Sequence, residues 1–255
     1  MYFKKCVFQI SKCLLTGLIL VQLGCKEDQP VTIKLDSTLE THLSLIQGNQ
    51  FGSARVRLRQ YMEQQGESSD ALFLMGLSYH QGRQYSKALE WFRKGISVNN
   101  GEIYPPIWHF LGWSYFYLGE LEQSKHSFEQ YLELQPNEAD SLFALGLIAT
   151  EDGNLQQAQQ LFVQSIRASS DDSVKAKATA RCADVVAELG DWQKAITLYQ
   201  EALQLNPDLY EAWYRLSSAL RRTVQEEKAS VAMQEFVLAR QRVRPDLDFQ
   251  TRFPE

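Results

Sequence analysis

The chain has 255 residues, of which 44% are hydrophobic and 22% are charged, a balance typical of a folded protein rather than of a disordered one. Its formal net charge at pH 7 is −5, and no block of basic residues stands out, so nucleic-acid binding is not expected. Length alone permits one or two domains.

The beginning of the chain differs in character from the rest. Residues 1–12 are basic, and residues 13–25 are almost wholly apolar. This apolar run is shorter than the about 20 residues that a membrane-spanning helix needs, and it is typical of a secretory signal peptide. We therefore predict a signal peptide over residues 1–24.

The end of this run resembles the signal of a bacterial lipoprotein, in which a cysteine after a glycine is acylated and becomes the first mature residue. The glycine–cysteine pair that ends at Cys25 fits, whereas Gln22 and Leu23 stand where such signals usually carry leucine and a small residue. The resemblance implies a lipidated Cys25, a linker over residues 25–34 and a membrane-anchored place in the cell envelope. Because Lys26 follows the cysteine, the outer membrane, facing the periplasm, is favoured over the inner membrane. The alternative is a signal peptide in which Cys25 is incidental.

The cysteines give no sign of a disulfide framework. Cys6 and Cys13 lie in the predicted signal peptide and Cys25 would carry lipid, so Cys182 remains alone. It precedes Ala183 on the inward face of a predicted helix, where a free cysteine behaves as a small hydrophobic residue. No cysteine-based metal site is expected, and neither a metal nor another cofactor is predicted.

Pairs of small residues recur twelve positions apart along the rest of the chain. The pairs are Gly76 and Ala88, Gly112 and Ser124, Gly146 and Ala158, Ala183 and Ala195, and Ser217 and Ala229, with a poorer match at His42 and Ala54. Successive first members are separated by 34, 36, 34, 37 and 34 residues. A nearly fixed period in this range indicates a repeat architecture.

The repeat around Gly76 shows what each repeat is expected to build. Leu72, Met75 and Tyr79 surround Gly76 at the spacing of one face of a helix, and Ala88 lies on the apolar face of a second helix after a turn. Two helices joined by a short turn pack antiparallel, and the small residues fall where the helices cross. The spacing is therefore interpreted as structural rather than catalytic.

Two stretches carry a resemblance to a known family. WHFLGWSY (108–115) resembles the first half of a tetratricopeptide repeat (TPR), and GDWQKAITLYQEALQLNP (190–207) resembles the second half. The resemblance implies an all-α fold, a right-handed α-solenoid of about six helix-turn-helix TPR units. The expected units lie near residues 35–68, 69–104, 105–138, 139–175, 176–209 and 210–243, followed by a C-terminal tail over residues 244–255.

The same resemblance implies that the first helix of each unit lines a concave groove that binds partners. The residues expected to line it are Phe73, Leu77, His80, His109, Trp113, Phe116, Tyr117, Phe143, Leu147, Tyr214, Arg221 and Arg222. The second, third and fourth units offer aromatic and apolar groups, whereas the last two offer charged residues such as Asp184. Two readings stay open for Trp113, Phe116 and Tyr117, which either face the groove or pack into the core.

Several functions lack support in the sequence. The four histidines are scattered, and no glycine-rich phosphate loop or nucleophile elbow is present, so no enzymatic activity is predicted. No asparagine follows the small residue of any unit, which gives no support to a clamp for C-terminal carboxylates of the chaperone type. Arg221 and Arg222 could still meet an acidic partner.

The predicted function is that of a membrane-tethered scaffold or adaptor of the bacterial cell envelope, which binds an extended peptide or a partner domain in the groove. The partner is a protein or peptide whose identity the sequence does not give, and the membrane is reached through the lipid anchor. The alternative is a protein that binds a small ligand or a cell-wall fragment by stacking it on Trp113 and Tyr117.

Overall fold

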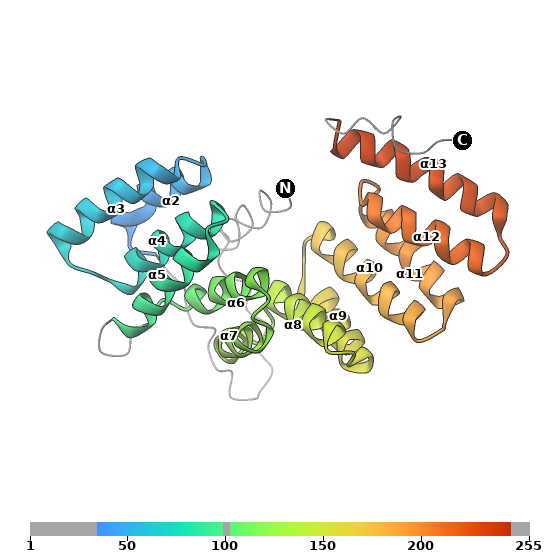
Figure 1. Ribbon diagram of the computed structural model, residues 1–255, viewed down its shortest axis with the longest axis horizontal. Coiled ribbons are helices and arrows are strands. Elements are labelled where there is room, and N and C mark those ends of the chain that lie inside the picture. The colour runs from blue at the N-terminus through green and yellow to red at the C-terminus, as the bar shows by residue number, and fades with distance from the viewer. Residues whose placement is uncertain (1–34, 99–102, 246–255) are drawn as a thin grey trace, which may run out of the picture. The chain divides into compact units, whose positions relative to one another are not determined.

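The computed structural model describes residues 35–98 and 103–245, and the part so described is built from twelve α-helices without a strand (Figure 1). The predicted signal peptide, Cys25 and most of the predicted tail lie outside these residues. The chain divides into two compact units, an N-terminal unit up to Pro136 and a C-terminal unit from Asn137. Each unit is described by itself below.

The helices follow one another in antiparallel pairs. In the N-terminal unit, a 3₁₀ turn (Ser37–Leu39) precedes α2 (Glu40–Gln47), α3 (Phe51–Gln65), α4 (Ser69–Gln81), α5 (Tyr85–Ser97), α6 (Pro106–Leu118) and α7 (Leu121–Leu134). In the C-terminal unit the helices are α8 (Ala139–Glu151), α9 (Leu155–Ala168), α10 (Asp172–Glu188), α11 (Trp192–Leu205), α12 (Tyr210–Arg222) and α13 (Glu226–Val243). The predicted all-α repeat fold is confirmed.

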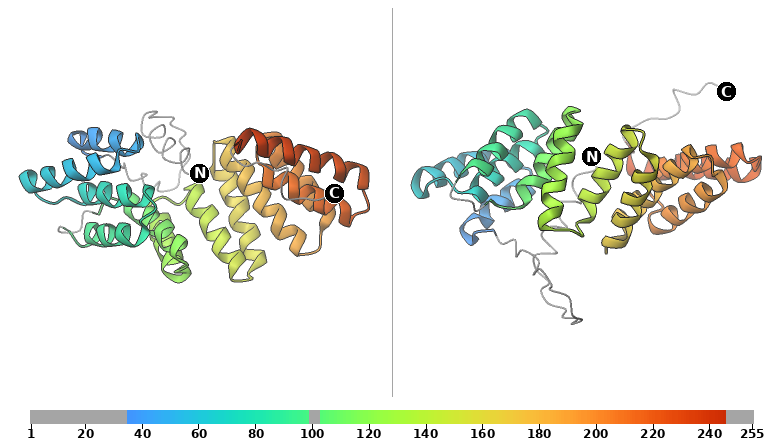
Figure 2. Two further views of the ribbon diagram at one scale, coloured as in Figure 1. Left: turned by 45° about the horizontal axis from the view of Figure 1, so that its top comes forward. Right: turned by 90° about the horizontal axis from the view of Figure 1, so that it is seen from below.

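Within the C-terminal unit, the first helices of the pairs lie next to one another. Helix α10 contacts both α8 and α12, and Figure 1 shows the three in that order. In Figure 2 the yellow-to-red helices of this unit follow one another side by side. The first helices therefore form one face of this unit, on which side chains from different repeats can meet.

The turn between the two helices of each described pair has the same backbone form. One residue in it has a positive φ, and these residues are Asn49, Arg83, Gly119, Gly153, Gly190 and Val224. The amide of the next residue donates to a carbonyl five positions back, as Gln84 does to Tyr79 at 2.9 Å and Gln225 to Leu220 at 2.9 Å. This hydrogen bond belongs to the Schellman motif, in which a left-handed residue ends a helix and satisfies its last carbonyls.

The small-residue pairs lie where the two helices of a repeat meet, as predicted. Ser124 Oγ donates to the carbonyl oxygen of Gly112 at 2.9 Å, and Ser217 Oγ donates to the carbonyl oxygen of Ala229 at 2.9 Å. Cys182 is buried in the core of the C-terminal unit, which confirms its expected place.

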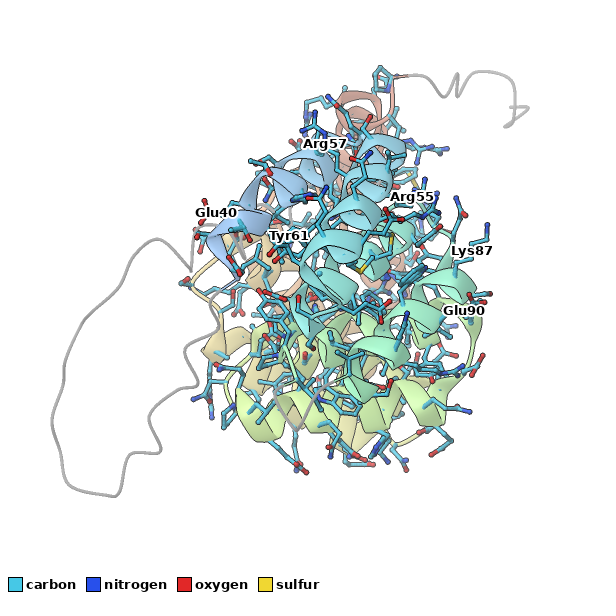
Figure 3. The ribbon with its side chains drawn as sticks, turned by 90° about the vertical axis from the view of Figure 1, so that its left-hand side faces the viewer. Glu40, Arg55, Arg57, Tyr61, Lys87 and Glu90 are labelled. Atoms are coloured by element: carbon cyan, nitrogen blue, oxygen red, sulfur yellow. The ribbon has the colours of Figure 1, made fainter. Side chains whose placement is uncertain are left out.

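At the edge of the N-terminal unit, cationic side chains of α3 and α5 cover an aromatic ring. The Arg55 guanidinium lies 4.4 Å from the centre of the Tyr79 ring, and the Lys87 ammonium lies 5.8 Å from it. Figure 3 shows Arg55 and Lys87 on neighbouring helices on the same side of the unit. The Arg55 contact joins the first two repeats, the Lys87 contact lies within the second, and Tyr79 between them is buried.

Candidate partner-binding surfaces

Five of the predicted groove residues are buried in the structure. The exposed fraction is 5% for Phe73, 2% for Leu77, 2% for His80, 6% for His109 and 6% for Trp113. The expectation that they line an open groove is therefore corrected.

The reason for this burial is that aromatic rings of successive repeats fill the space between the helices of the N-terminal unit. Phe73 lies 4.9 Å from Tyr104 and 5.6 Å from Phe110, and Trp113 meets Phe128 edge-on at 5.4 Å, all between ring centres. Of the two readings of Trp113, the structure supports the core.

His80 is held as a neutral group inside the N-terminal unit. Its Nδ1 lies 2.8 Å from Ser114 Oγ, and that hydroxyl donates to the carbonyl oxygen of Phe110 at 2.8 Å. The Ser114 hydroxyl thus joins the imidazole of His80 to the backbone of α6. Burial lowers the pKa of His80 to about 3, and the charge of His109 adds to the effect. His80 is thus a packing residue that links two repeats.

The exposed remainder of the aromatic strip lies at the end of α6. Phe116 is half-buried and Tyr117 is 37% exposed. Tyr117 stacks on Tyr85 of α5 with ring centres 4.7 Å apart and on Trp113 at 5.8 Å. Of the three rings, Tyr117 is therefore the one that is accessible to a partner.

The predicted groove residues of the C-terminal unit are more accessible. Phe143 and Leu147 of α8 are half-buried against the core, whereas Tyr214 of α12 is 52% exposed. Arg221 and Arg222 are also exposed, and the Arg222 guanidinium lies 5.3 Å from the centre of the Trp192 ring. This face is therefore the better candidate for contact with a partner.

A charged cluster on this face was not predicted from the sequence. The carboxylate of Asp184 on α10 accepts a hydrogen bond from the Tyr199 hydroxyl of α11 at 2.6 Å. The same carboxylate lies 3.1 Å from Arg181 Nη1 and 3.3 Å from Arg215 Nη1 of α12. The three-residue spacing of Arg181 and Asp184 could have indicated one ion pair, but Arg215 and Tyr199 join it only through packing.

Tyr199 donates the hydrogen bond to Asp184 in its protonated form, which is strongly favoured. Burial raises the pKa of its hydroxyl far above the ordinary value, and the neighbouring Asp184 carboxylate raises it further by charge and by hydrogen bonding. The phenol therefore keeps its proton at any physiological pH, and Asp184 is fixed where α10, α11 and α12 meet.

The N-terminal unit carries a pocket of about 570 Å³ between α5, α6 and α7. The lining residues are Arg93, Ile96, Trp108, Leu111, Tyr115, Glu122, Gln123, His126 and Ser127. Arg93 donates to the Tyr115 hydroxyl through Nε at 3.0 Å and Nη2 at 2.8 Å, which fixes its guanidinium beside the pocket. The sequence pattern places Trp108, Leu111 and Tyr115 only in a packed stripe and gives no sign of the pocket.

Over residues 35–98 and 103–245, histidine, cysteine and acidic side chains form no cluster of three or more that could hold a metal ion. Within the same ranges, none of the helices combines the length and the apolar character needed to cross a membrane.

Comparison with known proteins identifies repeats of one kind along the chain. The family model described as Tetratricopeptide repeat matches residues 43–102 and 111–173, and the one described as TPR repeat matches residues 183–222. Tetratricopeptide repeat protein 8 of Caenorhabditis elegans is 27% identical over 114 residues, which make up 44% of this chain and 22% of that protein. The matched part is thus about a fifth of that relative's length.

Solved structures of low sequence identity share the fold. The structure of pilF from Pseudomonas aeruginosa has a TM-score of 0.67 at 16% identity and covers 82% of this chain and 91% of its own. The structure of the APC/C hetero-tetramer Cut9-Hcn1 has a TM-score of 0.67 at 15% identity. The match covers 93% of this chain and 43% of the other chain. The structure of MamA from Desulfovibrio magneticus has a TM-score of 0.60 at 15% identity. The match covers 69% of this chain and 97% of the MamA chain.

Proposed function

Since this chain belongs to the tetratricopeptide repeat family, we propose that it is a scaffold of the bacterial cell envelope, tethered to the membrane through Cys25. Arrays of helical repeats present extended surfaces to other proteins, and members of this family are generally non-catalytic scaffolds. The scaffold acts by binding alone and holds a protein partner close to the membrane.

One observation supports the C-terminal unit as the place where the partner binds. Its face of first helices carries Tyr214 at 52% exposure, together with arginines that are exposed to solvent, whereas the matching residues of the N-terminal unit are mostly buried. Exposed tyrosine and arginine are the side chains most often found to dominate binding energy at interfaces. A structurally similar protein, Cut9, was solved as a hetero-tetramer with Hcn1, which agrees with a binding role for such folds.

A crosslinking experiment tests the position of the partner. A photoreactive amino acid placed at Ser218, which is exposed on α12, should give a discrete crosslinked protein in the cell envelope. The matched control places the same group at Gln193, exposed on the second helix α11. A partner that crosslinks equally from both positions, or from neither, would contradict the assignment of this face.

The tether has its own test. The Cys25→Ser variant should lose its label in cells fed a labelled fatty acid and should move from the membrane fraction to the soluble fraction, since two or three acyl chains hold a protein firmly on a membrane. Cys13→Ser serves as the control and should change neither result. A Cys25→Ser protein that stays labelled would show that the cysteine is incidental.

The pocket of the N-terminal unit favours a second candidate function, the binding of a small ligand or cell-wall fragment. Its volume of about 570 Å³ falls in the range of small-molecule sites, and Trp108 lies beside Arg93, Glu122 and Gln123. Muropeptides should then raise the melting temperature of the wild-type protein but not of Glu122→Gln or Gln123→Ala variants. Equal melting with and without muropeptides would exclude this candidate.

A further inference from the structure

The cluster around Asp184 holds more positive than negative charge. Two guanidinium groups, from Arg181 and Arg215, share a single carboxylate that is only 10% exposed. The arginine side chains themselves are 44% and 46% exposed. The buried end of the cluster is thus neutralised, while its outer side presents an excess positive charge to solvent.

Both arginines have N–H donors that Asp184 does not use. Arg181 uses Nη1 for Asp184, and Arg215 also approaches Asp184 through Nη1. Neither guanidinium makes another hydrogen bond with a protein group in the described ranges. Because a guanidinium carries five N–H donors in a fixed plane, each can still receive a second carboxylate. Asp184 and Tyr199 hold the two groups in place, which lowers the entropy that such binding would cost.

Two further arginines on α12 add positive charge to this face. Arg222 lies two helical turns after Arg215 on α12 and is exposed, as is the adjacent Arg221. The acidic residues on these two helices near the cluster, besides Asp184, are Glu188 and Glu211. The face is therefore positive in a chain whose net charge is −5, and it would attract an acidic segment in a salt-dependent way.

An exposed aromatic ring stands next to Arg215 in the sequence of α12. Tyr214 directly precedes Arg215 and is 52% exposed, with its ring 5.6 Å from that of Phe236. A ring supported on one side and open on the other is suited to hold an apolar side chain of a partner.

We propose that an extended partner segment binds here through an aspartate or glutamate side chain, which bridges Arg181 and Arg215 while a neighbouring apolar residue packs on Tyr214. The proposal rests on the proposed scaffold function and names the chemistry of its partner. The group recognised is a side-chain carboxylate within the segment, so a free C-terminus is not required.

Fluorescence anisotropy with designed peptides tests this on the full-length protein in detergent. The probe is a labelled peptide of alternating glutamate and leucine with an amidated C-terminus, and its partner probes replace every glutamate with glutamine or lysine. The glutamate peptide should bind at least about ten-fold more tightly than the glutamine peptide, and its binding should weaken as salt is added. The lysine peptide should not bind. Equal affinity for the glutamate and glutamine peptides, or no binding of the glutamate peptide up to about 1 mM, would overturn the proposal.

Variants locate the effect. Arg181→Gln and Arg215→Gln should each weaken binding of the glutamate peptide about ten-fold and leave binding of the glutamine peptide unchanged. Lys194→Gln, which removes an exposed cation from α11, is the matched control and should leave the affinity unchanged. If a glutamine variant has a lowered melting temperature, Arg181→Lys replaces it. This change keeps the positive charge beside Asp184 but removes the planar guanidinium that binds a carboxylate through two hydrogen bonds. It should still weaken binding of the glutamate peptide several-fold. Wild-type affinity in all three arginine variants would overturn the proposal.

The crosslink from Ser218 separates this inference from the proposed function. If the partner is still captured at the wild-type level by the folded Arg181→Gln and Arg215→Gln proteins, the acidic segment is wrong and the scaffold stands. If no protein is captured by the wild-type chain, the scaffold function itself fails.

Discussion

The ring of Phe92 occupies the space in which a side chain of residue 76 would lie. A Cβ on Gly76 would be 2.4 Å from Cε1 of Phe92, closer than real contacts of this kind. The relationship recurs in the next two repeats, where a Cβ on Gly112 would meet Phe128 at 2.9 Å and one on Gly146 would meet Phe162 at 2.6 Å. The glycine thus seats a large ring between the two helices of a repeat.

The first prediction follows from this contact. Gly76→Ala should lower the free energy of unfolding by about 1–3 kcal/mol, because Phe92 is completely buried and has little room to move away from the added methyl group. The measurement is urea unfolding, with Gly52→Ala as the matched control. Gly52 lies in α3, and a methyl group added there would have nothing within 4 Å of it, so that change should be neutral or stabilising. A Gly76→Ala protein as stable as wild type would show that the Phe92 ring adjusts freely.

The second prediction concerns the turn between α12 and α13. Val224 has a φ of 58°, a conformation that a β-branched residue adopts only under strain, and its side chain is 83% exposed. Val224→Gly should therefore raise the free energy of unfolding by about 0.5–1 kcal/mol, since the relief of strain exceeds the entropy that glycine adds to the unfolded chain.

The reverse change in an equivalent turn provides the control. Gly119 ends α6 at a φ of 77°, and Gly119→Val should lower stability by about 1–2 kcal/mol. A loss of stability in Val224→Gly would mean that the valine contributes packing that outweighs its strain.

The third prediction is a dependence of stability on pH. His80 has a folded-state pKa of about 3, lowered mainly by burial from an ordinary value of 6.5. Between these two values the unfolded chain binds a proton that the folded chain does not. This contribution to stability is thus fully present above pH 6.5 and is lost by about 1.4 kcal/mol for each pH unit below it.

Urea unfolding at about pH 7.5 and about pH 5 measures the effect. The wild-type protein should lose about 2 kcal/mol more than His80→Gln between the two values, because glutamine binds no proton and can still bond to Ser114. His126→Gln, which removes an exposed imidazole, should keep the wild-type slope. If His80→Gln and wild type lost the same stability, the histidine would not be the group responsible.

Much of the fold could be predicted because the repeat is visible in the spacing of residues that are close together in the sequence. Gly112 and Ser124 stand twelve residues apart in a pattern that recurs along the chain, and the structure joins them by a hydrogen bond. The burial of Phe73 and His80 could not be predicted, since it depends on which rings of the next repeat fill the space beside them. The cluster at Asp184 was missed for a similar reason, because Tyr199 and Arg215 come from two other helices.

The last prediction separates two neighbouring aromatic residues that sequence spacing treats alike. Trp113 is 6% exposed and meets Phe128 edge-on, whereas Tyr117, four residues later, is 37% exposed and stacks on Tyr85. Trp113→Ala should therefore lower the free energy of unfolding by about 3–5 kcal/mol, as loss of a large buried ring usually does. Tyr117→Ala should lower it by only about 1 kcal/mol, the value of an exposed aromatic pair. Trp113→Phe keeps a ring in place and should restore most of the loss. Urea unfolding of the three variants decides the matter, and equal losses in Trp113→Ala and Tyr117→Ala would contradict the division of this strip into a core ring and a surface ring.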